Sequence, residues 1–441
     1  MHADPQAPRP AARGPVVSRR EASPRTFRAL RHRNFRLFAG GQLISLVGTW
    51  MQSVAQSWLL YRLTHSAVML GAMGFLGQIP ILLLGPVAGV AADRMRRRNI
   101  VVTTQTLSLV CAFTLAGLTL ASAVREWHIF AAVLVMGCVN AFDMPARQAF
   151  LVEMVGREDL PNAIALNSSM FNGARIVGPA IAGLVVAALG EGWCFLLNGV
   201  SYVAVLVGLA RMRLEPRAEA PPTRGVLAHL HEGVTYVAGE EAVWRPLVLL
   251  GVVSLTAMPY LVILPIFADR VLHGGARGLG LLMSGAGVGA LAAALVLARR
   301  ESPRGLGPVL GLAPVGFGLA LLAFSFSRDL WLSTAVMVPV GFCMMTQMAS
   351  TNTTVQSVVP DLLRGRVMGL YGVMFLGVAP FGSLLVGWLA HTLGAPSAVR
   401  LGAGCAIVSG LIFLAQLGRF QTALHRMMPV RKLEPAEPPI A

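Results

Sequence analysis

Long apolar stretches separated by short polar turns are the dominant pattern of this chain. A helix of roughly 20 apolar residues crosses a bilayer core about 30 Å thick. The apolar stretches, twelve in number, lie near residues 35–60, 68–91, 99–122, 127–149, 162–189, 193–211, 245–268, 279–298, 307–326, 330–354, 367–391 and 399–418. They predict an all-α membrane protein, and their even number places both termini on one side of the membrane.

The second half of the chain repeats features of the first. A shift of about 204 residues moves the fifth stretch onto the eleventh and superposes Gly173 on Gly377, Gly178 on Gly382 and Gly183 on Gly387. Coincident glycines matter because they let helices approach closely in lipid. We therefore expect two pseudo-symmetric six-helix bundles with a binding site between them near the bilayer midplane.

A polar segment over residues 211–224 divides the two halves, and its prolines interrupt regular structure. After it, Val226, Leu227, Leu230, Val234 and Val237 recur at helical spacing, which fits an amphipathic surface helix or a plain solvated one. The expected organisation is an N-terminal tail over 1–34, a six-helix bundle over 35–211, a linker with this helix over 212–243, a second six-helix bundle over 244–419 and a C-terminal tail over 420–441.

Composition and charge place the chain in a membrane. It is 55% hydrophobic and only 13% charged, whereas soluble domains carry roughly 25% charged residues. Arginines cluster on alternate connections, over 9–36, 94–98, 211–224, 299–304, 364–366 and 419–432. By the positive-inside rule these connections and both tails are cytoplasmic. The net charge of +16 thus reflects membrane topology, and we expect no nucleic-acid partner.

Enzyme chemistry finds little support in the sequence. The only lysine is Lys432, and no GxxxxGK, HExxH or GxSxG motif is present. The five cysteines lie in apolar stretches without CxxC spacing. We expect no enzyme, no cofactor and no metal site.

The end of the second stretch carries a candidate gating motif, GVAADRMRRR over 89–98. It resembles the signature loop between helices 2 and 3 of the major facilitator superfamily, although Arg96 stands where that family has a second glycine. A plain basic loop is the simpler alternative. The gating candidates from this motif are Gly89, Asp93, Arg94, Arg97 and Arg98.

The fifth stretch contains Gly173, Gly178, Pro179 and Gly183. They resemble the Gly-Pro motif of superfamily antiporters, in which proline and glycine make a helix pliable. Ordinary close packing of glycines is the alternative.

Charged residues inside the stretches are costly and call for an explanation. Asp143 and Arg147 have i,i+4 spacing and are predicted to face each other. They fit a structural or gating pair, with Arg147 alternatively contacting Asp93, and they also fit a proton-carrying Asp143. Arg175 is deep in its stretch with no acid within one turn, so it faces a polar interior, a backbone carbonyl or an anionic ligand.

Polar and aromatic residues on the first stretch are candidates for a cavity that holds an amphipathic ligand. They are Gln42, Trp50, Gln52 and Gln56, and weaker candidates elsewhere are Asn140, Asn167 and Asn172. Hydrogen bonds between helices for the amides, and an interfacial position for the tryptophan, are the alternatives.

Further stretches carry a family resemblance, among them GTWMQ over 48–52, AFDMPARQ over 141–148 and NAIALN over 162–167. They resemble the transmembrane secretion effectors, an exporter branch that includes the enterobactin exporter and macrolide efflux proteins. The resemblance implies the major facilitator fold and export of a drug, siderophore or other metabolite across the bacterial inner membrane. It also implies proton antiport by a monomer. A non-transporting membrane receptor or assembly protein is the alternative, which flux through proteoliposomes would separate.

Overall fold

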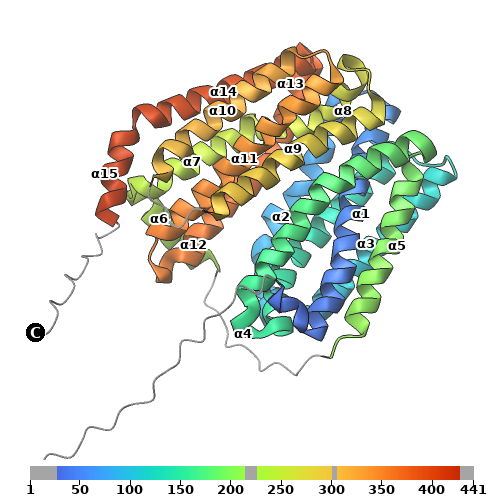
Figure 1. The fold of residues 1–441 in the computed structure, drawn as a ribbon, viewed down its shortest axis with the longest axis horizontal. Coiled ribbons are helices and arrows are strands. Elements are labelled where there is room, and N and C mark those ends of the chain that lie inside the picture. The colour runs from blue at the N-terminus through green and yellow to red at the C-terminus, as the bar shows by residue number, and fades with distance from the viewer. Residues whose placement is uncertain (1–26, 214–225, 300–304, 428–441) are drawn as a thin grey trace, which may run out of the picture.

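The computed structural model describes residues 27–213, 226–299 and 305–427 (Figure 1). Its described residues form helices and turns, without strands. The predicted N-terminal tail up to residue 26, the linker prolines, the basic turn over 300–304 and the tail after residue 427 lie outside the described residues.

The N-terminal bundle begins with a single 3-10 turn and continues in long helices. These are η1 (Arg28–Arg31), α1 (Arg33–Thr64), α2 (Ala67–Arg94), α3 (Arg97–Leu120), α4 (Glu126–Leu189) and α5 (Glu191–Ala210). The 64 residues of α4 contain the predicted fourth and fifth stretches, joined by a kink at Gly156 with φ 72° and ψ 176°. Only glycine adopts such a conformation without strain, so Gly156 interrupts the helix between the two crossings.

The linker helix and the C-terminal bundle follow. Their elements are α6 (Val226–Gly239), α7 (Glu241–Thr256), η2 (Met258–Ile263), α8 (Leu264–Ile266), η3 (Phe267–Val271), α9 (Gly275–Ala298), α10 (Leu306–Phe326), α11 (Leu330–Val358), α12 (Asp361–Gly372), η4 (Val373–Gly377), α13 (Ala379–Leu393), α14 (Ala395–Ala415) and α15 (Leu417–Met427).

Two crossings of the C-terminal bundle are broken helices, where the sequence pattern predicts continuous ones. The seventh runs through α7, η2, α8 and η3, and the eleventh through α12, η4 and α13. Pro259 and Pro265 interrupt the seventh because proline has no N–H for the helical ladder. Both crossings contain a π-helical turn, η3 and η4, a feature frequent at functional sites.

The expected twelve crossings are present. Ten helical segments of the described chain are long and apolar enough to cross a membrane. One of them, α4, supplies two crossings, and the more polar α1 adds another. The prediction of an all-α fold with two six-helix bundles is confirmed.

The two bundles touch on one side of the membrane and separate on the other. We call the side that holds α6, α12 and α15 the terminal side and the opposite one the distal side (Figure 1). On the distal side, a Cβ on Gly71 of α2 would lie 3.1 Å from the Gly387 Cα of α13, and a Cβ on Gly280 of α9 would lie 3.0 Å from the Gly183 Cα of α4. These glycines allow helices of different bundles to meet directly.

On the terminal side, a groove of about 750 Å³ lies between α2 and α12 and reaches η4, where a Cβ on Gly377 would lie 2.7 Å from the Leu82 side chain of α2. Its glycines include Gly85 and Gly89 of α2 and Gly365, Gly369 and Gly372 of the eleventh crossing, and a Cβ on any of them would meet nothing within 4 Å. The distal side is therefore closed and the terminal side open.

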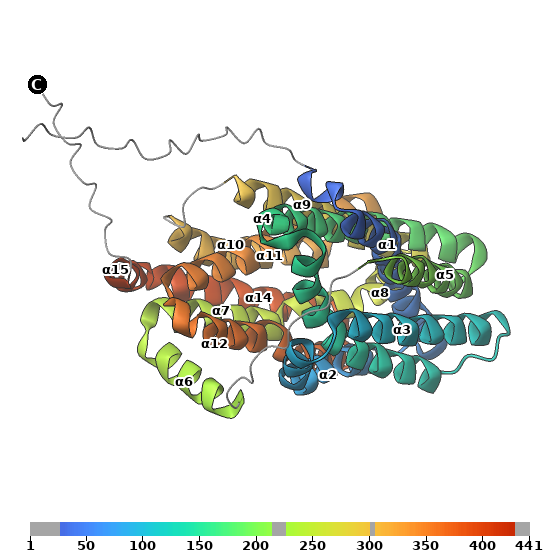
Figure 2. The ribbon, with the colours of Figure 1, turned by 90° about the horizontal axis from the view of Figure 1, so that it is seen from below.

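Short helical elements pack against each bundle at its terminal end. In both views α6 lies along α12 (Figures 1 and 2), where Glu232 forms an ion pair with Arg366. At the other bundle, Asp159 is only 2% exposed and binds Arg28 Nε at 2.7 Å, Arg31 Nη2 at 2.8 Å and His32 Nε2 at 2.6 Å. This cluster fastens η1 to α4 and was not predicted from the sequence.

Candidate substrate cavity and gate

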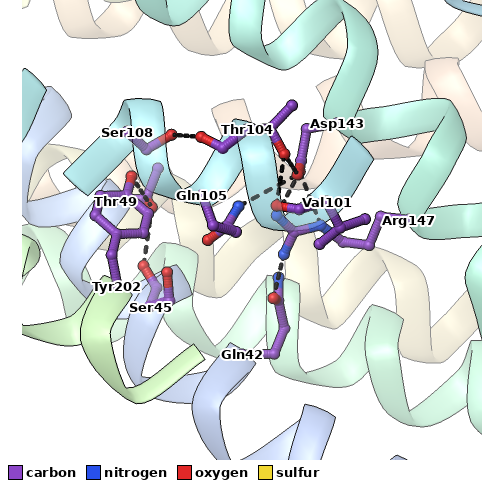
Figure 3. Close-up of polar contacts among 10 residues, drawn as sticks. All are labelled: Gln42, Ser45, Thr49, Val101, Thr104, Gln105, Ser108, Asp143, Arg147 and Tyr202. Atoms are coloured by element: carbon purple, nitrogen blue, oxygen red, sulfur yellow. Dashed lines mark hydrogen bonds and ion pairs between the residues drawn. The ribbon is translucent and has the colours of Figure 1, made fainter. Parts of the chain in front are cut away.

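A largely buried ion pair of α4 connects helices of the N-terminal bundle (Figure 3). Asp143 and Arg147 lie one turn apart on α4, and the Arg147 Nε donates to the Asp143 Oδ2 at 2.8 Å. The same carboxylate accepts hydrogen bonds from Thr104 Oγ1 at 2.7 Å and Gln105 Nε2 at 3.2 Å, both on α3. The other end of the guanidinium donates to the Gln42 side chain of α1.

The pair therefore ties three helices together and leaves little uncompensated charge in a low-dielectric interior. The i,i+4 contact predicted from the sequence is present. The alternative contact between Arg147 and Asp93 is not formed, because the Arg147 guanidinium is held by Asp143 and Gln42.

A cavity of about 390 Å³ opens beside this pair. Polar side chains that line it are Gln42, Ser45, Thr49, Gln105, Ser108, Asn140, Gln148, Asn167, Ser168, Asn172 and Tyr202. Apolar side chains that line it are Leu46, Met136, Val139, Met144 and Phe171. All of these residues belong to the N-terminal bundle, and the mixture of surfaces suits an amphipathic molecule.

The structure divides the predicted pathway residues into two groups. Gln42, Asn140, Asn167 and Asn172 line the cavity. Gln52 does not, because its Oε1 accepts a 2.7 Å hydrogen bond from the Asn198 Nδ2 of α5, as the helix-bonding alternative supposes.

The remaining candidates lie outside the cavity lining. Gln56 is 8% exposed, and its amide nitrogen has no hydrogen-bond partner among the described residues. Trp50 packs edge-on against Phe171, with ring centroids 5.9 Å apart. The guanidinium carbon of Arg175 lies 5.8 Å from the centroid of the Trp50 ring.

Several cavity residues were missed by the sequence analysis. Gln105 and Ser108 of α3 and Tyr202 of α5 complete the polar wall. Thr104 of α3 is not part of the lining but donates to the Asp143 carboxylate (Figure 3). The signal for the α3 residues is their helical spacing within an otherwise apolar stretch, which places them on one face.

The residues of the gating motif fall into two sets. Arg97 donates to the Ala149 carbonyl of α4 at 2.6 Å and pairs with Glu153 at 3.2 Å. Arg98 donates to the Leu209 carbonyl of α5 at 2.9 Å. These two arginines fix the turn between α2 and α3 to their own bundle.

The other members of the motif face the open terminal side. Gly89 lines the groove. Asp93 and Arg94 are exposed at the end of α2, and neither forms an ion pair with another described residue.

Two glycines of the fifth stretch, Gly178 and Gly183, are packing positions in this structure. A Cβ on Gly178 would lie 2.9 Å from the Val47 carbonyl oxygen of α1, and one on Gly183 would lie 3.0 Å from the Ala276 carbonyl oxygen of the other bundle. A Cβ on Gly173 would meet nothing within 4 Å. The helix is regular through Pro179, and flexibility at these positions stays a prediction.

Two six-helix bundles that meet on one side and separate on the other, with a polar cavity in the N-terminal bundle, define a membrane transporter of the major facilitator type. Residues 24–435 match the family described as transmembrane secretion effector. The chain belongs to this family, and the resemblance and transport function expected from the sequence are confirmed.

Alignments with named relatives cover most of the chain. It is 26% identical to the staphyloferrin A transporter of Staphylococcus aureus, covering 81% of this chain and 89% of the relative. It is 29% identical to the multidrug efflux pump Tap of Mycolicibacterium fortuitum, with 81% and 89% covered. It is 25% identical to the enterobactin exporter EntS of Shigella flexneri, with 88% and 94% covered.

Solved structures share the fold. The nucleoside transporter NupG superposes with a TM-score of 0.67 at 16% identity, covering 89% of this chain and 98% of NupG. A variant of the peptide transporter POT gives a TM-score of 0.70 at 14% identity, covering 90% and 95%. At these identities the likeness concerns the architecture alone.

Proposed function

We propose that this protein exports an amphipathic small molecule across the bacterial inner membrane in exchange for protons. The observation that carries the proposal is the cavity beside Asp143 and Arg147, in a molecule that is closed on the distal side and open on the terminal side. Arginine clusters support a cytoplasmic terminal side, so cargo enters from the cytoplasm. Both termini are then cytoplasmic.

The cargo class follows from the lining. Met136, Val139, Met144 and Phe171 offer apolar surface, and the amides and hydroxyls opposite them offer hydrogen bonds. Siderophores and drugs, which the names of the relatives specify for those proteins, combine both properties. A single chain supplies the cavity, the contacts that close the distal side and the groove on the terminal side. The proposed functional unit is therefore a monomer.

Coupling is assigned to Asp143, the acidic residue among those that line the cavity. When ionised, its carboxylate holds Arg147. A proton arriving from the outside weakens this pair and frees the guanidinium to rearrange, and release of the proton to the cytoplasm restores it. Binding of a proton and binding of cargo thus alternate at the hydrogen-bond network around Asp143 and Arg147.

Transport also requires the terminal side to close. Gly85 and Gly89 of α2 face the glycines of the eleventh crossing across the groove, and they are small enough to pack as Gly71 and Gly387 do on the distal side. In the closed state, Asp93 approaches the N-terminus of α12, where the helix dipole favours a negative charge. Arg94 anchors the moving turn to lipid, and bending near Gly173, Gly178, Pro179 and Gly183 accommodates the change.

Flux through proteoliposomes tests the function. The purified protein is reconstituted and offered a panel of siderophores and amphipathic drugs, with and without an imposed pH gradient. Gradient-dependent movement of at least one compound that is lost in Asp143→Asn supports the proposal. Specific binding of a membrane protein partner without flux of any compound favours the receptor or assembly alternative.

A further inference from the structure

The side-chain amide of Gln105 leaves a buried acceptor beside the cargo cavity. Gln105 lines this cavity and is only 3% exposed. Its Nε2 donates to the Asp143 Oδ1 at 3.2 Å (Figure 3). Because the carboxylate of an ion pair can only accept, this bond fixes which end of the amide is the nitrogen. The Gln105 Oε1 at the other end has no hydrogen-bond partner among the described residues.

A second acceptor of the same kind belongs to this lining. Asn167, on the second of the two crossings in α4, also lines the cavity. Its Oδ1 is buried without a hydrogen-bond partner in the part of the chain that the structure describes. Buried polar atoms are nearly always bonded, and each exception calls for an explanation. Two unbonded acceptors in one cavity are explained by a ligand that supplies the donors.

The cation of the lining and two of its hydroxyls are, by contrast, already engaged. The Arg147 guanidinium donates to Asp143 and Gln42. The hydroxyls of Thr49 and Ser108 donate to backbone carbonyls one turn back on their own helices, at 2.8 and 2.9 Å. Asp143 also neutralises the charge of Arg147. An anionic cargo group would therefore meet lone pairs here rather than an uncommitted positive charge.

The cavity has material that can adapt around a ligand. The Gln105 and Asn167 oxygens carry almost no accessible surface in the empty cavity. Met136 and Met144 belong to the same lining, and unbranched methionine side chains change shape easily. A cargo molecule that displaces them gains room to reach the two oxygens.

We propose that Gln105 and Asn167 recognise hydroxyl or N–H donors of the cargo and disfavour anionic groups. The donors bind the Gln105 Oε1 and the Asn167 Oδ1, while the apolar body of the cargo lies against Phe171 in the same cavity. This site rests on the proposed function and narrows its cargo to amphipathic molecules that present hydrogen-bond donors. Cargo without donors leaves both buried acceptors unbonded, which is costly, and binds more weakly.

Matched naphthalenes test the site in the purified full-length protein. Naphthalene-2,3-diol and naphthalene-2,7-diol are uncharged at neutral pH and offer two spacings of their hydroxyls. Their dimethyl ethers keep the aromatic body and lose both donors. In calorimetric titrations, wild type should bind at least one diol roughly ten- to a hundredfold more tightly than its ether, the range expected when buried acceptors gain or lack their donors.

Substitutions assign the preference to the two amides. Gln105→Met and Asn167→Leu each remove one acceptor and should lower the diol preference several-fold, with little change in affinity for the ether. Asn167→Asp keeps an acceptor at its position and should keep the preference. Thr104→Val is the matched control for Gln105→Met. Thr104 Oγ1 bonds the same Asp143 oxygen at 2.7 Å but is not part of the lining, so its loss removes no acceptor from the cavity and should keep the preference.

Three results would overturn the site. One is a wild type that binds neither diol more tightly than its ether. Another is an undiminished diol preference in both Gln105→Met and Asn167→Leu. The third is an equal loss in Thr104→Val, which would assign the effect to Asp143 and not to the Gln105 acceptor. All these affinities are read without a gradient, so absence of flux beside an intact diol preference would contradict the proposed function and leave the donor site standing.

Discussion

The hydroxyl of Tyr61 donates a 3.0 Å hydrogen bond to the Asp269 carboxylate and joins the two bundles at the distal side. Tyr61 belongs to α1 and is 1% exposed, and its ring packs edge-on against His65 with centroids 5.5 Å apart. Asp269 lies in the π-helical turn η3. Together with the glycine contacts, this bond stabilises the distal-closed state.

Removal of this bond should open the distal side. A hydrogen bond to a charged group contributes about 1.5 to 3 kcal/mol, so Tyr61→Phe should raise the distal-open population about tenfold or more. Distances between spin labels at Ala123 and Arg328, exposed positions on distal turns of the two bundles, report this in a background without other cysteines. Tyr202→Phe is the control, because Tyr202 contacts Thr49 within one bundle. An unchanged distance distribution in Tyr61→Phe would remove the bond from the gate.

Two glycines of α2 should respond oppositely to the same substitution. Gly71→Leu places a side chain where a Cβ already meets the Ser383 carbonyl at 2.7 Å, so it should force the distal side open. A Cβ on Gly89 would meet nothing within 4 Å, so Gly89→Leu, which extends into the open groove, should leave the observed state intact.

A transport assay distinguishes the two glycine variants further. Gly89→Leu should bind cargo and yet fail to transport it, because a leucine fills the groove that must close. Normal flux in Gly89→Leu, with wild-type expression in the membrane, would show that this glycine face takes no part in closure.

Breaking the buried ion pair should destabilise the fold. Asp143→Asn leaves the Arg147 charge without its carboxylate, a loss of about 3 to 5 kcal/mol for a buried pair. Asp143→Asn/Arg147→Gln removes both charges and should recover much of the loss in a thermal melt of the detergent-solubilised protein. A double variant that is less stable than Asp143→Asn would contradict the pairing.

Reporter fusions test the orientation. Alkaline phosphatase fused after Leu433 should be inactive, because the arginine clusters place this tail in the cytoplasm. The same reporter inserted at Ser122, on the turn between α3 and α4, should be active. The reverse pattern of activities would place the open side of the molecule outside.

The crossings could be predicted from the sequence because a bilayer demands about 20 apolar residues for each. The breaks within the seventh and eleventh crossings could not be predicted in this way. Pro259 and Pro265 lie in an apolar run that reads as one helix, and the π-helical turn at η4 contains no proline at all. Local backbone breaks of this kind depend on neighbouring helices that fill the released hydrogen bonds.

The cavity was predictable only where its contacts are local. The i,i+4 spacing of Asp143 and Arg147 predicts that they pair, since both lie on one helix face. The bonds from Thr104 and Gln105 join residues nearly forty positions away along the chain. Gln52 and Gln42 look alike in the sequence, yet one bonds Asn198 and the other lines the cavity, because the rotation of α1 against its neighbours separates them.

Proton movement on addition of cargo tests the central claim most directly. Proteoliposomes that contain a trapped pH-sensitive dye and a pH gradient, acidic inside, are given a compound found to be transported. The account predicts proton efflux that starts with cargo entry through the wild-type protein and is absent from Asp143→Asn, with cargo uptake abolished when an ionophore collapses the gradient. Cargo accumulation against its gradient at an undiminished rate after that collapse, or in Asp143→Asn, would contradict it.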